Sequence, residues 1–199
     1  MTVFYFVKLT NCSYLYFKNL LTNRSFCGII YLKMMGTHIP RKEARNMSTA
    51  TKNRSVSYPH LSPTKTQQSF FRVADAVSSL SDHSFAKLGC VLVDKHRIIS
   101  SGHNSSTRCS PLQKQIDVAR FGDPDKHKGP VHAETSCLLP LIRQGYDMTR
   151  SDLYIVRRHK NGSLALSRPC PGCMSLLRAN GVRRVFFSVE GGYSVERVN

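Results

Sequence analysis

The hydrophobic and polar positions of residues 69–199 follow a pattern that predicts alternating helices and strands. Apolar residues three or four positions apart predict a helix over residues 69–80, and further helices are expected over 132–144 and 171–180. Short apolar runs predict strands, which cover residues 88–93, 97–101, 152–158, 182–189 and 193–198. Because helices and strands alternate, we expect an α/β fold, a three-layer α/β/α sandwich with a mixed central sheet.

Turn-forming residues separate these elements. Residues 94–96, 161–162 and 190–192 each predict a hairpin, since they join two strand-like runs through Gly, Asn or Asp. Gly145 suits the C-cap of the second helix. Pro140 lies inside that helix, and because proline removes one backbone hydrogen bond we expect a kink there.

The first 68 residues differ in composition from the rest. Residues 1–46 are rich in Phe, Tyr and Leu, but basic residues interrupt them so often that no uncharged run reaches the ~18 residues of a membrane span. They lack the features of a signal peptide, which leaves two interpretations: an organelle transit peptide, or translation that begins at Met47, which we prefer. Residues 47–68, rich in Ser, Thr, Pro and Lys, predict a disordered linker before a folded domain at 69–199.

The chain is strongly basic, with a net charge of +17. Residues 47–199 hold twenty-two Lys and Arg against eleven acids, so this charge is not confined to the N-terminal segment. Such a charge favours polyanions, either phosphorylated nucleotides or RNA and single-stranded DNA, although a basic surface without an assigned partner is also common. The seven cysteines are odd in number, and Cys90 and Cys137 lie in apolar segments, so we expect reduced core thiols in an intracellular, cytoplasmic protein.

Two short patterns carry the candidate chemistry: His132-Ala133-Glu134, and Cys170 and Cys173 within Pro-Cys-Pro-Gly-Cys. His132, Cys170 and Cys173 supply three zinc ligands and leave the fourth position open, as catalytic zinc sites do. Cysteines three apart share one face of a helix, and a helix N-terminus favours the thiolate that zinc binds. Glu134 is not needed as a ligand and is free to move protons.

Together the patterns read H-x-E and then P-C-x-x-C, which is the signature of zinc deaminases and predicts a hydrolytic deamination. Zinc activates a bound water, and Glu134 takes the proton of that water and returns it to the ring nitrogen and the departing amine. The carbon attacked is C4 of cytosine or C6 of adenine. A structural zinc site is the alternative, because Cys-x-x-Cys alone also occurs in redox motifs and zinc knuckles. The two patterns in this order are far more specific.

The combined pattern resembles the cytidine and deoxycytidylate deaminase superfamily over about residues 67–199. The resemblance implies a zinc cofactor, a nucleotide substrate and self-association, since many relatives are oligomers. It also implies that Asn104 contacts the substrate sugar and that the backbone around Ala133 touches the base. A turn asparagine explains Asn104 equally well. With a histidine as its first zinc ligand, the chain resembles the deoxycytidylate, tRNA-adenosine and polynucleotide deaminases within this superfamily.

Residues 105–131 are predicted to be a polar insertion. Some deoxycytidylate deaminases carry a second, structural zinc in such a region, and His103, Cys109 and His127 are the potential ligands here. Their spacing matches no zinc pattern, so we interpret them as scattered surface residues. Lys126 and Lys128 either contact a phosphate or solvate the loop.

Three functions remain open from the sequence. The first is deamination of a free cytosine nucleotide, dCMP to dUMP, with release of ammonia. The second is editing of a cytosine or adenine within RNA or single-stranded DNA, which the basic run 157–160 supports unless that run is a solvated hairpin tip. The third is a non-catalytic zinc protein that binds nucleic acid, and Glu134 argues against it.

Overall fold

The computed structural model describes residues 2–9, 12–19, 57–121 and 130–198. The chain forms two units, Met1–Lys52 and Asn53–Asn199. In the first unit, β1 (Thr2–Leu9) and β2 (Cys12–Asn19) pair antiparallel along their full lengths. The roles predicted for residues 1–46 stay predictions. Residues 20–56, which include the first part of the predicted linker, lie outside the described residues.

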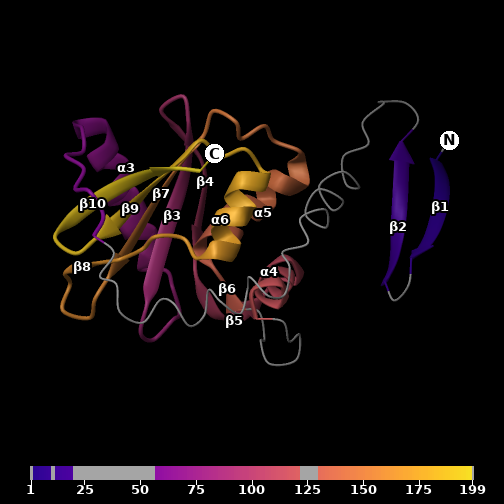
Figure 1. The fold of residues 1–199 in the computed structure, drawn as a ribbon, viewed down its shortest axis with the longest axis horizontal. Helices are drawn as coiled ribbons and strands as arrows, with labels where there is room; N and C mark the ends of the chain where they lie inside the picture. The colour runs from indigo at the N-terminus through magenta and orange to yellow at the C-terminus, as the bar shows by residue number, and fades with distance from the viewer. Residues whose placement is uncertain (1, 10–11, 20–56, 122–129, 199) are drawn as a thin grey trace. The chain divides into compact units, whose positions relative to one another are not determined.

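The second unit is built on a six-stranded mixed sheet, whose strand order is β10-β9-β7-β3-β4, with β8 paired to β7 (Figure 1). The strands are β3 (Lys87–Asp94), β4 (Arg97–His103), β7 (Asp152–Arg158), β8 (Leu164–Ala165), β9 (Arg184–Val189) and β10 (Gly192–Arg197). Only β7 and β9 run parallel among these pairs; the others are antiparallel. Each predicted strand is therefore present, with ends displaced by two residues at most.

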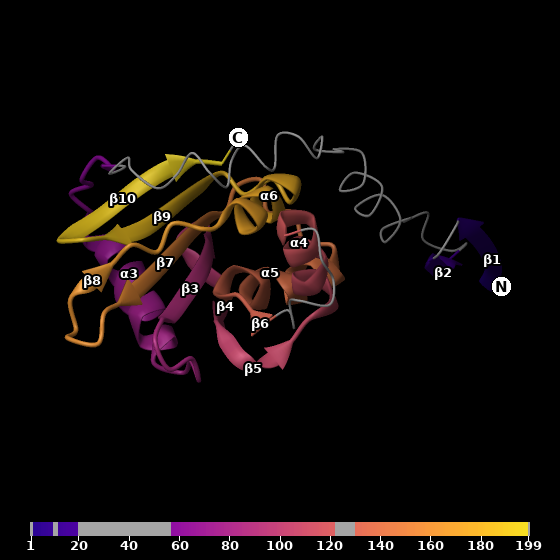
Figure 2. The ribbon, with the colours of Figure 1, turned by 60° about the horizontal axis from the view of Figure 1, so that its bottom comes forward.

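Helices cover both faces of this sheet. Helix α3 (Lys65–Ser78) packs on one face, and α5 (Ala133–Gln144) and α6 (Pro171–Ala179) lie on the other (Figure 2). Glycine marks the closest approach on each side, because a Cβ on Gly89 would collide with the backbone of α3 and a Cβ on Gly102 with that of α5. The predicted three-layer sandwich is confirmed. Among the described residues, no helix is both long enough and apolar enough to cross a bilayer.

The face under α3 holds an aromatic cluster. Phe71 of α3 lies edge-on to Tyr154 of β7 and stacks on Tyr193 of β10. Tyr154 also stacks on Phe186 of β9, with ring centroids 4.5 Å apart. Aromatic pairs of this kind add to the free energy of burying their surface, so this face is a main source of stability.

The disordered linker predicted up to residue 68 is wrong for residues 57–68. Thr64 caps α3 in a reciprocal capping box with Gln67, so the helix begins four residues earlier than predicted. Upstream of the cap, Leu61 donates its backbone N–H to the carbonyl of Tyr193 on β10. The Ser, Thr and Pro residues that suggested disorder here supply a helix cap and an extended segment along the sheet.

The insertion contains regular structure that its polar sequence did not reveal. It forms β5 (Ser105–Cys109), α4 (Pro111–Phe121) and β6 (Pro130–Val131), and β5 pairs with β6. Proline at the first position of α4 suits a helix start, since its missing N–H would be unpaired there. Helix α4 packs against α6, the helix that carries the two cysteines.

Candidate metal centre

The starts of α5 and α6 bring the three predicted ligands together. His132 is the N-cap of α5 and Cys170 is the N-cap of α6. His132 Nδ1 lies 3.3 Å from Cys173 Sγ and 3.7 Å from Cys170 Sγ. All candidate ligand atoms of the group lie within 4.8 Å of one another.

Local sequence explains the shape of the cysteine loop. Pro171 begins α6, and the Cys170 sulfur accepts the backbone N–H of Cys173 at 3.5 Å. Gly172, between the cysteines, leaves no room for a side chain, because a Cβ there would collide with the Ile116 side chain of α4. The helix of the insertion therefore shapes the loop that presents the sulfurs.

These donors fit a zinc ion. Zinc binds imidazole nitrogen and thiolate sulfur at about 2.0–2.3 Å in a tetrahedron, which places ligand atoms about 3.5–3.8 Å apart. The observed 3.3 and 3.7 Å separations are close to that requirement. Three protein ligands leave one coordination position for water or substrate, which is the arrangement of a catalytic site.

The pKa values of the group favour a thiolate at Cys170. Its hydrogen bond with Cys173, and next that with His132, lowers the Cys170 pKa to about 3 against the opposing effect of burial. The hydrogen bond with Cys170 raises the pKa of His132. The hydrogen bond with Cys170, together with burial, raises the pKa of Cys173. A sulfur that is ionised at neutral pH is ready to bind a metal.

Glu134 lies in the first turn of α5 beside these donors. Its side chain is only 3% exposed, and burial raises the pKa of the carboxyl although the neighbouring His132 opposes this. It also contacts the Cys173 thiol. A buried carboxyl next to a potential water site is suited to accept and return protons.

A hydrogen-bond network centred on Gln113, which the sequence did not predict, holds the start of α5. Gln113 of α4 is fully buried, and its Oε1 accepts the backbone N–H of His132 at 3.3 Å and the Thr135 hydroxyl at 2.6 Å. Its Nε2 donates to Asp117 at 3.0 Å. No local pattern marks the role of Gln113, because the α5 residues that it binds lie 19 and 22 residues away.

Ala133 lies between His132 and Glu134 in the sequence, and Asn104 directly follows β4. Asn104 is 8% exposed; its Oδ1 accepts from Leu88 N at 2.8 Å and Ser81 Oγ at 2.7 Å, while its Nδ2 donates to Ala86 O. These bonds tie the segment after α3 to the ends of β3 and β4. Contacts from Asn104 to a sugar and from Ala133 to a base stay predictions.

The remaining sulfur and metal predictions have mixed outcomes. Cys90 and Cys137 are free and buried, as expected. Within the part of the chain that the structure describes, His132, Cys170 and Cys173 form the only group of three or more potential metal ligands. Cys109 is exposed and free. The other insertion residues weighed for metal or phosphate binding, Lys126, His127 and Lys128, lie outside the described residues.

Comparison with known proteins agrees with this site. A sequence model of the cytidine and deoxycytidylate deaminase zinc-binding region matches residues 64–189. The deoxycytidylate deaminase of Mycobacterium phage D29 is 29% identical over 130 residues, which are 61% of this chain and 92% of that protein.

Solved structures with some similarity include the dCMP deaminase of cyanophage S-TIM5. Its apo form is 19% identical, with 60% of this chain and 79% of that chain covered and a TM-score of 0.44. Its complex with dCMP and dUMP is 20% identical, with 64% and 83% covered and the same TM-score. The family match spans more than half of the sequence and includes both motifs. The chain therefore belongs to the cytidine and deoxycytidylate deaminase family, zinc-dependent hydrolases that remove the exocyclic amine of a nucleobase.

Proposed function

We propose that this protein deaminates a free cytosine nucleotide, converting dCMP and water to dUMP and ammonia. The observation that carries the proposal is the similarity to a deoxycytidylate deaminase over 92% of that relative's length. The clustered donor atoms of His132, Cys170 and Cys173 support it by offering a three-ligand zinc site beside a buried carboxyl.

In this proposal, His132, Cys170 and Cys173 hold the zinc ion. When bound, zinc supplies Lewis acidity that makes water nucleophilic near neutral pH. Glu134 accepts a proton from the attacking water and delivers it to the ring nitrogen. It then takes the remaining proton of the added hydroxyl and passes it to the amine, so the C4–N bond breaks and ammonia leaves while a carbonyl forms.

Other side chains keep the proton carrier in place. Gln113 holds the backbone N–H of His132 and the hydroxyl of Thr135, on either side of Glu134 in the sequence. This grip fixes the first turn of α5, and with it the direction of the Glu134 side chain. Positioning of this kind matters because a displacement of about 1 Å can cost roughly 100-fold in rate.

A polynucleotide substrate is less well supported. The basic run 157–160 does not form one stripe, because Arg158 makes a bidentate ion pair with Asp75 of α3, with N–O distances of 2.7 Å. Arg157 precedes it on the same strand and so points to the opposite face. The edge that was the best candidate for a nucleic-acid groove is thus divided between two faces of the sheet.

The test is ammonia release by the zinc-loaded full chain, with Glu134→Gln as the matched control. The panel contains dCMP, CMP, deoxycytidine, cytidine, adenosine and short single-stranded DNA and RNA. Glutamate-dependent turnover of dCMP above all other substrates is expected. Turnover confined to the oligonucleotides, or to adenosine, would contradict the proposed substrate.

A further inference from the structure

Arg157 lies on the metal-site face of the sheet. Side chains of β7 alternate between faces, and Tyr154 and Val156 belong to the cluster under α3. Ile155 and Arg157 therefore project to the other face, where α5 and α6 lie. Arg158, the next residue, returns to the α3 face and its ion pair with Asp75.

The strand register places Arg157 one row along the sheet from the row that meets the start of α5. Ile155 pairs with Cys90, and Cys90 pairs with Gly102, so these three form one row across the sheet. Gly102 lies directly against the backbone of Ala133 at the start of α5. Arg157 lies two residues beyond Ile155, about 6.6–6.8 Å further along the strand. It pairs with Leu88, whose backbone N–H is bound by Asn104.

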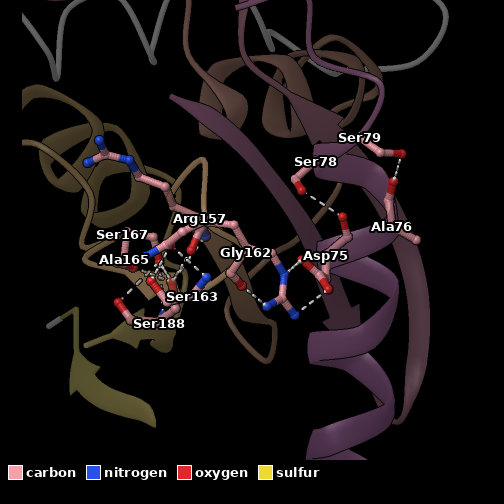
Figure 3. A network of polar contacts seen from close by, with 12 residues as sticks. Asp75, Ala76, Ser78, Ser79, Arg157, Gly162, Ser163, Ala165, Ser167 and Ser188 are labelled. Carbon is pink, nitrogen blue, oxygen red and sulfur yellow. Dashed lines mark hydrogen bonds and ion pairs between the residues drawn. The ribbon is translucent and has the colours of Figure 1, made fainter. Parts of the chain in front are cut away.

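The guanidinium of Arg157 has no ion pair or hydrogen bond within the described residues, and its Nε is buried without a partner. Figure 3 shows its side chain extending away from Asp75 and from the serines at 167 and 188, with no dashed line at its guanidinium. The neighbouring arginines differ, since those at 158, 168, 183 and 184 each bind a carboxylate. A buried, unpaired guanidinium nitrogen is costly unless an anion binds there.

We propose that Arg157 binds the 5′-phosphate of the nucleotide whose base lies at the candidate metal centre. The guanidinium forms a rigid fork of donors that matches phosphate oxygens, so one side chain can both attract and orient the group. Arg157 lies one row beyond the row of Ile155, Cys90 and Gly102, which meets the start of α5. This position suits a phosphate that extends from the sugar, away from the base. The proposal rests on the proposed function for the identity of the nucleotide, and it makes Arg157 the residue that separates dCMP from deoxycytidine.

The test compares ligands with and without phosphate on the same protein. Calorimetry on the zinc-loaded full chain measures the affinity for dUMP, deoxyuridine and a 5′-phosphorylated oligodeoxynucleotide. The variants are Arg157→Gln, which removes the charge, and Arg157→Lys, which keeps the charge but loses the fork. Arg143→Gln, an equal charge change in the last turn of α5, is the control.

Arg157→Gln should weaken dUMP binding about 10- to 100-fold, the range expected for losing a charge-assisted hydrogen bond. The dUMP affinity of Arg157→Lys should lie between those of the wild type and Arg157→Gln. The deoxyuridine affinity should stay unchanged in every variant. The ratio of dUMP to deoxyuridine affinity does not depend on the fraction of folded protein, so partial unfolding cannot imitate the result.

Other results would overturn the inference. One is that the wild type binds dUMP and deoxyuridine with equal affinity. The other is that the ratio of dUMP to deoxyuridine affinity is unchanged in Arg157→Gln. Arg157 dependence seen only with the oligonucleotide, with a steep loss of affinity as salt rises, would assign the phosphate to a strand instead. If dUMP binding depends on Arg157 but the wild type releases no ammonia from dCMP, the proposed function fails while the phosphate contact stands.

Discussion

The two faces of the central sheet are packed in different ways. Under α3 the contacts are large rings, with Phe71, Tyr154 and Phe186 in a continuous series of edge and stacked pairs. Each face also has one close glycine contact, Gly89 of β3 against the backbone of α3 and Gly102 of β4 against that of α5, but only the Gly102 contact lies at the helix start that carries Glu134. Small residues let the helix start come close to the sheet, at the position where the candidate ligands converge. The α3 face therefore carries the series of aromatic pairs, while the close glycine contact on the α5 face positions the helix start with its polar side chains.

Removal of the proton carrier on the α5 face should have the largest effect, and this effect should be on kcat and not on stability. Glu134→Gln keeps the shape of the side chain but cannot carry protons, so kcat on dCMP should fall about 100- to 10,000-fold. Metal analysis should show unchanged zinc, because the glutamate is not needed as a ligand. Full activity in a variant of verified zinc content would show that another group moves the protons.

Truncation of the aromatic cluster should lower stability and leave kcat nearly unchanged. Phe71 is 1% exposed, so Phe71→Ala should lower the free energy of unfolding by about 3–5 kcal/mol through lost burial and a cavity. Urea denaturation measures this loss, and kcat per folded molecule should stay close to that of the wild type. A comparable loss of kcat in the folded fraction would mean that the two faces are mechanically coupled.

A matched glycine pair compares the faces directly. Gly89→Ala pushes its Cβ into α3, and Gly102→Ala pushes its Cβ into α5. Both should lose about 1–3 kcal/mol of stability by overpacking. Only Gly102→Ala should also lower kcat, because the displaced helix carries His132 and Glu134. Equal activity of the two folded variants would contradict the division between faces.

The smallest effect is expected at Asp152, on the α3 face. Burial opposes its ionisation, but hydrogen bonds from Arg184 and Arg183 prevail and hold its pKa below the ordinary 3.8. A carboxyl with a lowered pKa stabilises the folded protein above pH 3.8, and this contribution disappears as the pH falls through the folded pKa. Asp152→Asn should therefore cost about 1 kcal/mol at pH 7, since both arginines are partly exposed and screened. The difference from the wild type should shrink below about pH 4, and unfolding at pH 7, 5 and 3.5 would test it.

Features that depend on neighbouring residues were predictable from the sequence. Strand 152–158 was predicted with its observed bounds, because a short apolar run suffices to identify a buried strand. The ligands His132, Cys170 and Cys173 were predicted to meet, because each stands at a helix start that the sequence marks.

Features that depend on distant partners were missed. The role of Gln113 follows from hydrogen bonds to residues on another helix, which no local spacing encodes. Helix α4 was missed because its apolar positions lie within a segment that was interpreted as one polar insertion. The linker prediction failed for residues 57–68 because composition alone does not separate a disordered Ser and Thr segment from a capping box.

The contact between Gly172 and Ile116 has a consequence for protein engineering. The loop that presents the sulfurs and the insertion occupy one shared volume, although 56 positions separate them in the sequence. A larger residue at 172 would collide with the Ile116 side chain, so we expect a smaller residue at 116 to relieve it. The cysteine motif and the insertion are thus one packing unit, and a transplanted Pro-Cys-Pro-Gly-Cys segment would need its helical neighbour to keep its shape.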